Sequence, residues 1–525
     1  MLKIAIPTAV QLVIDDVGWR EGWSLAESGG PFRAGVNRLM GPADYYAITE
    51  LGERLGMRPQ AAMVLCEWDK TNICATCPTS TAAGAAWDNS SRIGSWSDEA
   101  AAIFRQRAPY IELTMHGVGH EHWENGERIR AEWYSARHNR RWPRPVLEKH
   151  IEVFQAILDQ YDLGPAAGHR PPVSAVPCAF NYYFDAEDPD STGALFRQAG
   201  VEFVSTPFRG GFHHFSPLAA PDGGFEHGLL VIDRGRNGVP WDSWSTVPEQ
   251  PERGPICGIH WPNLLAEDPS RHHEVLEKWV HYLSNTAASG AQMLAADTRE
   301  CFTQWVFSRF VTLRQTDVVD ADGEAVKIVL DATQIPAEAE TLTAGSPLWL
   351  KLRRPAHHQA GGQAHRGHGT PPLAVFSSTL RLIAISDPDP DGYQLIGLSG
   401  ITKGRHLLVI DARPAKGTCI AEGATWEHPP LVKREKGSCH LFDMKINQES
   451  LEISVEVYGR QPLLVELPAP PHRVTATGGK LRVEDEEYLP YLPGGRGMGL
   501  LRLNIRGKDI QGERDTIRLD LQPVV

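Results

Sequence analysis

The feature that most constrains the fold of this 525-residue chain is a change of pattern near residue 311. Before that point, short strand-like apolar runs alternate with segments whose apolar residues recur every three to four positions. After it, short strand-like runs follow one another, separated by turn signals such as Asp322-Gly323. Because the chain is too long for a single ordinary core, the two patterns predict two successive regions.

The first region, residues 1–311, is predicted to be an α/β structure with β-α units repeated around a parallel sheet or barrel. Its clearest strand-like runs are Ile111–Met115, Phe203–Pro207, Leu229–Asp233 and Ile256–His260. Its clearest helical patterns are Val146–Gln160 and Arg271–Ser284. In such folds catalytic groups lie where strands end and loops begin, so polar residues at strand ends are the candidate site.

The second region, residues 312–525, is predicted to be β-rich, with one or two β-sandwich modules. We expect a binding module or a surface for homo-oligomerisation, although nothing in it names a ligand. Residues 357–369 contain glycine and histidine without apolar anchors, which predicts a mobile loop, with a histidine-rich metal tract as the alternative. No predicted helix follows Gly495, Gly497 and Gly499, which argues against a nucleotide-binding fingerprint.

Composition limits the partners and the location. Apolar residues at 42% and charged residues at 22% are typical of a folded soluble protein, and the net charge of -13 argues against a nucleic-acid partner. No segment reaches about 18 uncharged apolar residues, so no membrane partner is expected. Eight widely spread cysteines favour a reducing compartment, so we expect a cytoplasmic location. The pair Cys74 and Cys77 is expected to be two buried thiols rather than a metal or redox site.

Two adjacent carboxylates, Asp15 and Asp16, follow a short apolar run. Neighbouring side chains of an extended strand point to opposite sides, but a bend at the strand end turns both toward one site. Near a divalent cation both stay ionised, so that one binds the metal while the other accepts a proton. The alternative for this pair alone is a solvated turn.

A second strand is predicted to end at His116, and His120 follows four residues later. Histidines at this spacing on a helical turn lie on one face and can share a metal. With Asp16 they complete a set of two histidines and one carboxylate that leaves a coordination position for water. His122 is an alternative to His120 at a less favourable spacing.

Two further segments carry polar side chains at predicted strand ends. Arg170 lies in a loop stiffened by two prolines, where its guanidinium can hold a carboxylate through two hydrogen bonds. His260 ends an apolar run, a position where a histidine alone is more often structural. The order of all four groups within one region favours a shared site.

The order Asp-Asp, His-x-x-x-His, Arg-x-Pro and strand-end His resembles the NodB-like polysaccharide deacetylases, over about residues 8–310. The resemblance implies a distorted β/α barrel of the deacetylase type and removal of acetyl groups from N- or O-acetylated sugars. The roles it implies are general base for Asp15, metal ligands for Asp16, His116 and His120, orientation of Asp15 for Arg170, general acid for His260, an oxyanion-binding N–H for Val173, and support of His260 by Asp233 or Asp242.

The chain departs from the family pattern at several positions. Ile14 and Val17 flank the two aspartates, where the family usually has phenylalanine and glycine. Gly117 follows the first histidine in place of serine or threonine, and Val173 replaces an aromatic residue. These changes leave the predicted metal ligands intact and put the substrate in question.

Aromatic residues gather near the predicted strand ends, and flat rings offer apolar faces to the C–H surfaces of sugars. We expect Trp19, Trp68 and Trp123 to contact the substrate, with filling of the outer core as the alternative. Asp69 follows the apolar run Ala61–Cys66 and is a further candidate for substrate contact.

Together these inferences predict a metal-dependent hydrolase that acts on an acylated carbohydrate or small amide. Zinc suits a nitrogen-rich ligand set, and nickel, cobalt or manganese can occupy the same ligands. Two alternatives stay open. One is a glycoside hydrolase, which needs two opposed carboxylates, and the other is a carbohydrate-binding protein that has lost its activity.

Overall fold

A computed structural model describes the parts of the chain on which the following sections rest. The described residues are 2–22, 24, 30–31, 33–169, 173–209, 212–214, 217–288, 290–318, 325–353, 374–377, 379–386, 388–389, 391–411, 419–421, 424–426, 431–433, 439–446, 449–457, 460–467, 470–490, 499–507 and 513–521. The chain divides into two compact units. The helix-rich unit comprises Val10–Thr286 and Leu294–Phe302, and the strand-rich unit comprises Met1–Ala9, Ala287–Met293 and Thr303–Val525.

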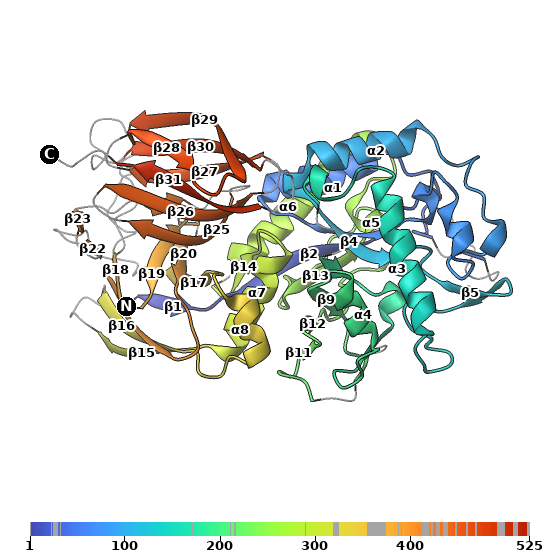
Figure 1. Cartoon of the computed structure of the whole chain (residues 1–525), viewed down its shortest axis with the longest axis horizontal. Helices are drawn as coiled ribbons and strands as arrows, with labels where there is room; N and C mark the ends of the chain where they lie inside the picture. The colour runs from blue at the N-terminus through green and yellow to red at the C-terminus, as the bar shows by residue number, and fades with distance from the viewer. Residues whose placement is uncertain are drawn as a thin grey trace. The chain divides into compact units, whose positions relative to one another are not determined.

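A curled sheet forms the centre of the helix-rich unit (Figure 1). In spatial order its strands are β11 (Gly223–Glu226), β12 (Leu229–Asp233), β9 (Phe203–Thr206), β7 (Ser174–Ala175), β4 (Glu112–Gly117), β3 (Gln60–Val64), β2 (Thr8–Val17) and β13 (Ile256–His260), and β14 (Gln292–Leu294) belongs to the same sheet. The seven strands from β12 to β13 pair in parallel. Their carboxyl ends therefore lie at one edge of the sheet, where polar residues can meet.

The prediction of a distorted β/α barrel of the deacetylase type is wrong. In the described residues the path of the sheet runs from β11 to β13 and does not close. The edge strand β11 pairs antiparallel with β12, where a closed barrel would continue with a parallel strand. The connection between β12 and β13, residues 234–255, contains no helix, whereas a regular barrel places a helix after each strand.

Helices surround the parallel strands (Figure 1). They are α1 (Pro42–Leu55), α2 (Ser95–Gln106), α3 (Arg144–Asp159), α4 (Thr192–Gln198), α5 (Trp261–Leu264), α6 (His272–Ala288) and the first part of α7 (Thr298–Phe310). Helix α3 shows why such segments become helical. Leu147, Ile151, Phe154 and Leu158 recur at helical spacing and are buried, while Pro145 lies in the first turn, where its missing N–H costs nothing.

Two small sheets complete the helix-rich unit near the carboxyl edge of its main sheet. Strands β5 (His122–Glu124) and β6 (Glu127–Ile129) form a hairpin, and β8 (Tyr182–Phe184) pairs in parallel with β10 (Phe212–His214).

Three larger sheets and a short hairpin make up the strand-rich unit. The first contains, in order, β1 (Lys3–Ala5), β17 (Leu348–Arg353), β20 (Tyr393–Ser399), β19 (Arg381–Ile385), β24 (Leu431–Lys433), β27 (Arg460–Leu467), β30 (Gly499–Gly507) and β29 (Leu481–Pro490). The second contains β15 (Thr312–Val318), β16 (Ala325–Asp331), β21 (Arg405–Asp411) and β18 (Ala374–Ser377), and the third β25 (His440–Ile446), β26 (Ser450–Val457), β31 (Glu513–Asp520) and β28 (Arg473–Ala476). Strands β22 (Cys419–Ala421) and β23 (Ala424–Trp426) form the hairpin, and helix α8 spans Ala337–Thr343.

Several sequence predictions for the second region lie outside the described residues. These are the Asp322-Gly323 turn, residues 357–369, Gly495 and Gly497. Strands β15 and β16, on either side of the predicted turn, pair antiparallel. In β26 the buried side chains Leu451, Ile453 and Val455 alternate with more exposed ones, as expected for a strand with one face in a core.

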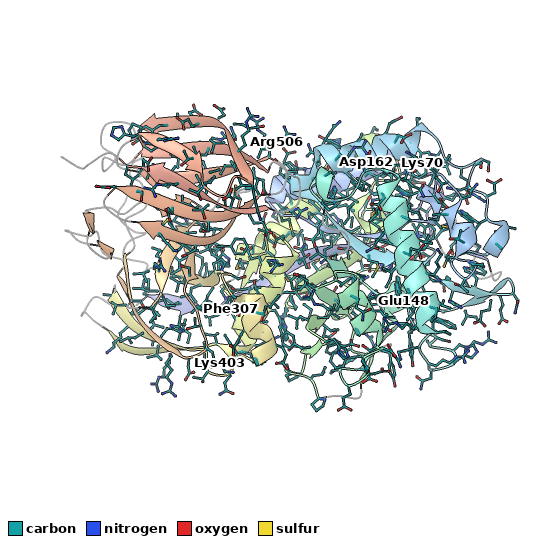
Figure 2. The ribbon with its side chains drawn as sticks, viewed as in Figure 1. Lys70, Glu148, Asp162, Phe307, Lys403 and Arg506 are labelled. Carbon is teal, nitrogen blue, oxygen red and sulfur yellow. The ribbon has the colours of Figure 1, made fainter. Side chains whose placement is uncertain are left out.

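Side chains divide by burial in both units. Charged residues such as Lys70, Glu148 and Arg506 are exposed, whereas Phe307 is buried (Figure 2). Cys74 and Cys77 are buried free thiols, as the sequence predicts. Among the described residues, no helix is long and apolar enough to cross a membrane.

Candidate metal centre

A β-bulge at the end of β2 brings two carboxylates to the carboxyl edge of the sheet. The register between β2 and β3 shifts between Ile14 and Val17, and Asp16 has a φ of 64°. A bulge adds one residue and redirects the neighbouring side chains, and aspartate tolerates the left-handed region better than most residues. Asp15, by contrast, lies in register with His260 of β13. Both carboxylates are buried.

A second bulge lies at His116. The register between β3 and β4 shifts between Met63 and Val64, which pair with Met115 and Gly117, so His116 is the extra residue. His120 follows a tight turn and has a φ of 69°. The two histidines therefore lie on a strand end and a turn, not on the predicted helical turn. Their ring centroids are 5.4 Å apart, so the strand end and the turn also bring the two imidazoles close to each other.

The hydrogen bonds of both imidazoles leave their Nε2 atoms directed at Asp16. Nδ1 of His116 donates to the carbonyl of Val176 at 2.6 Å, and Nδ1 of His120 donates to Glu121 Oε1 at 3.3 Å. Nε2 of His116 and Nε2 of His120 lie 3.4 and 3.6 Å from Asp16 Oδ1. A proton on Nδ1 leaves a lone pair on Nε2 of a neutral imidazole, which is the tautomer that binds metals.

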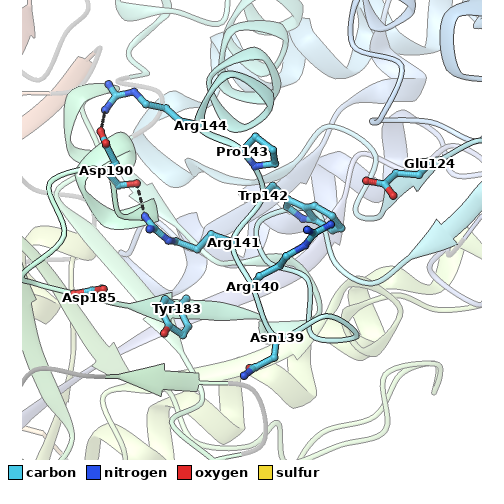
Figure 3. Close-up of a pocket in the computed structure, with 10 residues that line it drawn as sticks. All are labelled: Glu124, Asn139, Arg140, Arg141, Trp142, Pro143, Arg144, Tyr183, Asp185 and Asp190. Atoms are coloured by element: carbon cyan, nitrogen blue, oxygen red, sulfur yellow. Dashed lines mark hydrogen bonds and ion pairs between the residues drawn. The ribbon is translucent and has the colours of Figure 1, made fainter.

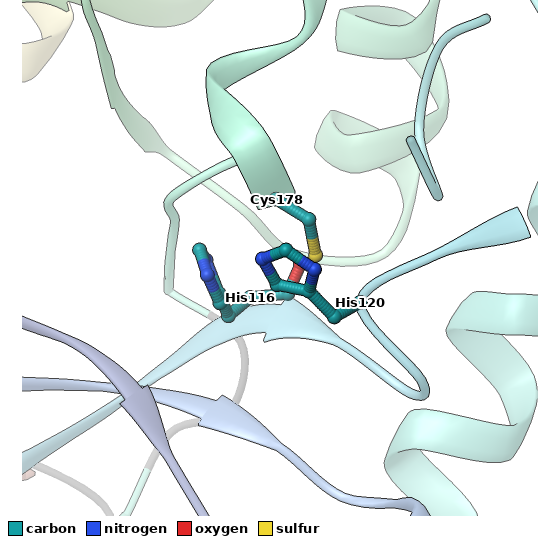
Figure 4. Close-up of side chains that lie close together, drawn as sticks. All are labelled: His116, His120 and Cys178. Atoms are coloured by element: carbon teal, nitrogen blue, oxygen red, sulfur yellow. The ribbon is translucent and has the colours of Figure 1, made fainter. Parts of the chain in front are cut away.

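His116, His120 and Cys178 form a buried group that can bind a metal ion (Figure 4). Their potential ligand atoms all lie within 4.8 Å of one another. No sequence motif indicates Cys178, which lies three residues after the end of β7. Its thiol donates to the carbonyl of His116 at 2.7 Å, and burial raises the pKa of this thiol well above its ordinary value. Cys178 is thus held as a neutral thiol when no cation is bound.

The charges at this edge are strongly coupled. Burial alone would raise the pKa of Asp16, but the nearby His116, His120 and His260 imidazoles hold it well below its usual range. Burial alone would likewise lower the pKa of His116, but Asp16 and Asp15 raise it. Neither oxygen of Asp16 accepts a geometrically good hydrogen bond within the described residues. A buried anion of this kind favours positive charge beside it.

His122 does not belong to this group. Its ring stacks on Trp142 with centroids 3.6 Å apart, and its Nε2 lies 3.4 Å from Glu124. Burial and the neighbouring His150 lower the pKa of His122 to about 3. The structure therefore gives His122 a packing role.

A buried carboxylate, Glu132, holds the turn that carries His120. It accepts the backbone N–H groups of Val118, Gly119 and His120 at 2.7, 3.1 and 2.8 Å. It also accepts Nδ1–H of His150 at 2.8 Å, and its charge contributes to a pKa of about 10 for His150 although burial alone would lower it. Three backbone donors on one carboxylate fix the path of the turn, and no sequence motif pointed to this residue.

Two glycines let this turn pack closely. A Cβ at Gly117 would lie 2.3 Å from Glu132 Oε2 and 2.6 Å from the sulfur of Cys178. A Cβ at Gly119 would lie 1.6 Å from the carbonyl oxygen of Ser80. The glycine at 117, which departs from the family pattern, is therefore required here by the neighbouring carboxylate.

Arg234, which follows β12, is the partner of Asp15. Its Nη1 and Nη2 donate to Oδ1 and Oδ2 of Asp15, both at 3.0 Å, and both side chains are buried. The predicted partner, Arg170, lies outside the described residues. A bidentate pair of this kind fixes the orientation of the carboxylate.

His260 is held by an amide rather than by an aspartate. Arg234 Nη2 donates to Asn237 Oδ1 at 3.0 Å, which turns the amide nitrogen of Asn237 toward Nδ1 of His260 at 3.1 Å. Since this nitrogen can only donate, Nδ1 accepts and the proton of a neutral His260 resides on Nε2, 3.9 Å from Asp16 Oδ2. Burial lowers the pKa of His260, although Asp15 and Asp16 act against it.

The aspartates predicted to support His260 lie elsewhere in the network. Asp233 accepts the backbone N–H groups of Phe208 and Gly235. Asp242 packs close to Gly35. Both predictions are wrong, because the connection after β12 presents Asn237 to His260 instead.

Gly258 of β13 makes room for this network. A Cβ there would lie 2.1 Å from Arg234 Nη2 and 2.4 Å from Asn237 Oδ1. The hydrogen-bonded side chains from Asp15 through Arg234 and Asn237 to His260 therefore pass close to the backbone of β13 at Gly258. Only glycine fits at this position without displacing Arg234 and Asn237.

Val173 lies at the opposite edge of the sheet. Its carbonyl accepts the N–H groups of Glu202 and Phe203, at the amino end of β9. The carboxyl end of β7 is instead occupied by Val176 and Cys178, which contact His116. The prediction of an oxyanion-binding N–H at Val173 is wrong, because β7 follows this loop rather than preceding it.

Three of the predicted substrate contacts are core residues. Trp68 is fully buried, stacks on Phe104 and donates from Nε1 to the carbonyl of Gly18. Trp19 is also fully buried, under the guanidinium of Arg33. The carboxylate of Asp69 accepts N–H groups of the following loop, including that of Cys74 at 2.9 Å. Trp123 differs, because it lines a pocket beside Gly119.

A second pocket, of about 580 Å³, lies between the start of α3 and the segment after β8 (Figure 3). Arg141 and Arg144 both reach Asp190 across it, and Arg141 also pairs with Asp188. These arginines are thus engaged in joining the two walls. Trp142 lines this pocket and stacks on His122, which lies two residues after His120.

The chain matches no known family model and no curated protein sequence.

Proposed function

We propose that the chain is a metal-dependent hydrolase that removes an acyl group, typically acetyl, from an N- or O-acylated carbohydrate or a related amide. One observation carries the proposal. Asp16 is buried, its pKa lies well below its usual range, and its Oδ1 lies 3.4 and 3.6 Å from Nε2 of His116 and Nε2 of His120. Two imidazoles and a buried carboxylate converge in this way where they share a cation.

The distances from Asp16 Oδ1 to each imidazole support zinc. Two ligands at about 2.0–2.1 Å from a tetrahedral ion lie about 3.4 Å apart, close to both distances from Asp16. We therefore propose Asp16, His116 and His120 as the ligands, with Cys178 as a neighbouring thiol that stays bonded to a backbone carbonyl. Nickel, cobalt and manganese accept the same ligands. Three protein ligands leave a position for water, as catalytic sites require.

A cation bound there supplies a water of lowered pKa and polarises an acyl carbonyl. Asp15, fixed by Arg234, keeps lone pairs beyond those that accept the guanidinium, and we assign it the proton of the attacking water. His260 presents Nε2–H beside Asp16, and we assign it donation of a hydrogen bond to the departing nitrogen or oxygen, which would take its proton from Asp15. Asn237 keeps the proton of His260 on Nε2.

The resemblance to the NodB-like deacetylases supports the acyl chemistry. The order of Asp15, Asp16, His116, His120 and His260 along the chain is that of the family. The open sheet and Arg234 are departures from the family, so the proposal depends on the ligand geometry more than on the fold.

Acetate release from a panel of N- and O-acetylated saccharides and small amides tests this function. We expect activity that EDTA removes and that zinc, cobalt or nickel restores. Asp16→Asn and His116→Ala should lose metal and activity together, while Cys178→Ser, the matched control, should keep both. Release that persists in fully metal-free protein would refute the proposal.

A further inference from the structure

Glu121 follows the proposed ligand His120 directly and faces its imidazole. Oε1 of Glu121 lies 3.3 Å from Nδ1 of His120, the ring nitrogen that does not face Asp16. Neighbouring side chains of an extended strand point to opposite sides, but His120 has a φ of 69°, so the chain bends there and the carboxylate meets the ring. No motif in the sequence indicates a role for Glu121.

The second oxygen of Glu121 has no partner. The side chain is buried, and its Oε2 makes no hydrogen bond within the described residues. In the same part of the chain, the contact with His120 is the only ion pair that Glu121 makes. Buried carboxylates are normally paired and hydrogen-bonded, because removing their charge from water is costly. A carboxylate with so little support therefore points to a positive charge that acts on it through His120.

The other buried carboxylates around the turn have their own counter-charges. Asp15 pairs with a guanidinium at 3.0 Å, and Glu132 pairs with a protonated imidazole at 2.8 Å. Asp16 and Glu121 face imidazoles of the site and, within the described residues, no lysine or arginine. When these imidazoles are neutral, the two carboxylates carry two negative charges in total, which one divalent cation balances.

The two imidazoles proposed as ligands differ in what holds their Nδ1 atoms. His116 donates to the carbonyl of Val176, a neutral acceptor, whereas His120 donates to a carboxylate. A carboxylate acceptor fixes the tautomer and the orientation of the ring and makes Nε2 a stronger donor to a cation. Glu132 holds the backbone N–H of His120, so the two glutamates act on different parts of the same residue.

We propose that Glu121 is a positioning residue of the metal centre, whose carboxylate orients the His120 imidazole and strengthens its bond to a divalent cation. The inference rests on the proposed function, because it takes His120 as a ligand. It places one of the two charges that balance the cation outside the ligand set. Outer partners of this kind contribute about tenfold to hundredfold to metal affinity.

Zinc titration of the full chain, with a chromophoric chelator as competitor, measures this contribution. Glu121→Gln keeps the shape and one acceptor oxygen but removes the charge, and it should weaken zinc binding by about tenfold to hundredfold. Glu121→Asp, which keeps the charge on a shorter side chain, should recover part of that affinity. The visible spectrum of the cobalt-loaded Glu121→Gln protein should match that of the parent, because the ligands are unchanged.

Glu124→Gln is the matched control. Oε1 of Glu124 lies 3.4 Å from Nε2 of His122, a similar contact between a carboxylate and an imidazole, but His122 does not belong to the metal group. Zinc affinity in this variant should stay within about twofold of the parent.

The metal-free proteins separate positioning from a role in folding. Glu121→Gln removes a buried charge whose second oxygen has no partner in the described residues, so the melting temperature without metal should fall by less than about 2 °C. The rise in melting temperature that zinc produces should shrink, because bound metal stabilises in proportion to its affinity. A large fall in the metal-free protein would show a role in folding and overturn the proposal.

The remaining outcomes distinguish this proposal from the hydrolase. Unchanged zinc affinity in Glu121→Gln, an equal loss in Glu124→Gln, or an altered cobalt spectrum would overturn the role of Glu121, even if acyl hydrolysis is found. Zinc binding that depends on Glu121 in a chain without acyl hydrolysis would support this role and refute the hydrolase. A parent chain that binds no divalent cation would refute both.

Discussion

Replacing Glu132 by glutamine removes the charge that holds the turn of His120. The carboxylate is fully buried and accepts three backbone N–H groups as well as the His150 imidazole. Glutamine keeps one acceptor oxygen and places an NH₂ group against donors, which leaves His150 without its counter-charge. Breaking a buried pair by removing one partner costs about 3–5 kcal/mol. At about 2–4 °C per kcal/mol, the melting temperature should fall by about 10 °C.

Differential scanning calorimetry at pH 7, with metal analysis of the same samples, checks this expectation. Metal content should fall as well, because the turn no longer fixes His120. Glu148→Gln is the matched control, since Glu148 is exposed and pairs with Arg144 on the same helix, and it should shift the melting temperature by less than about 2 °C. A Glu132→Gln protein that melts within 2 °C of the parent and keeps its metal would refute the assigned role.

The same pair predicts a pH dependence of stability. The folded chain keeps a proton on His150 up to a pKa of about 10, whereas the unfolded chain releases it near 6.5. The folded state therefore binds more protons between these values, and stability should fall as the pH rises through this window. Stability against pH, measured by urea unfolding, should lose this slope in His150→Gln, and an identical slope in that variant would contradict the assignment.

Three further substitutions test other parts of the site. Gly258→Ala forces a methyl group against Arg234, which orients Asp15, and should lower kcat at least a hundredfold with metal retained. A normal kcat would show that Asp15 does not need to be held by Arg234. Asn237→Leu removes the donor to Nδ1 of His260 and should lower kcat about tenfold or more without changing metal content. An unchanged kcat would count against a catalytic role for the His260 tautomer with its proton on Nε2. Trp68→Ala should lower stability by about 3–5 kcal/mol and leave KM of the folded protein unchanged, whereas a raised KM with normal stability would restore it as a substrate contact.

Part of this arrangement is readable from the sequence. The strand over Ile256–His260 lies where its apolar run predicts, as does that over Leu229–Asp233, because each run is bounded by turn residues. Polar residues at the carboxyl ends of parallel strands then meet at one edge, which is why Asp16 and His116 could be paired in advance. The two bulges that aim them have no sequence signal.

Other parts were out of reach for physical reasons. Strand β7 has only two residues, Ser174–Ala175, too few to show a period, so the sequence pattern places the preceding loop at a strand end and predicts the wrong role for Val173. Arg234 and Asn237 belong to a connection without periodic pattern, and their roles depend on the space left by Gly258. The antiparallel edge strand β11, which ends the sheet instead of closing a barrel, pairs through contacts that local sequence does not specify.

X-ray absorption spectroscopy of the zinc-loaded chain tests the ligand assignment most directly. The account predicts only nitrogen and oxygen neighbours at about 2.0–2.1 Å, with the same spectrum in Cys178→Ser and no bound zinc in Asp16→Ala. A sulfur neighbour at about 2.3 Å would show that Cys178 replaces Asp16 as the third ligand and would contradict it.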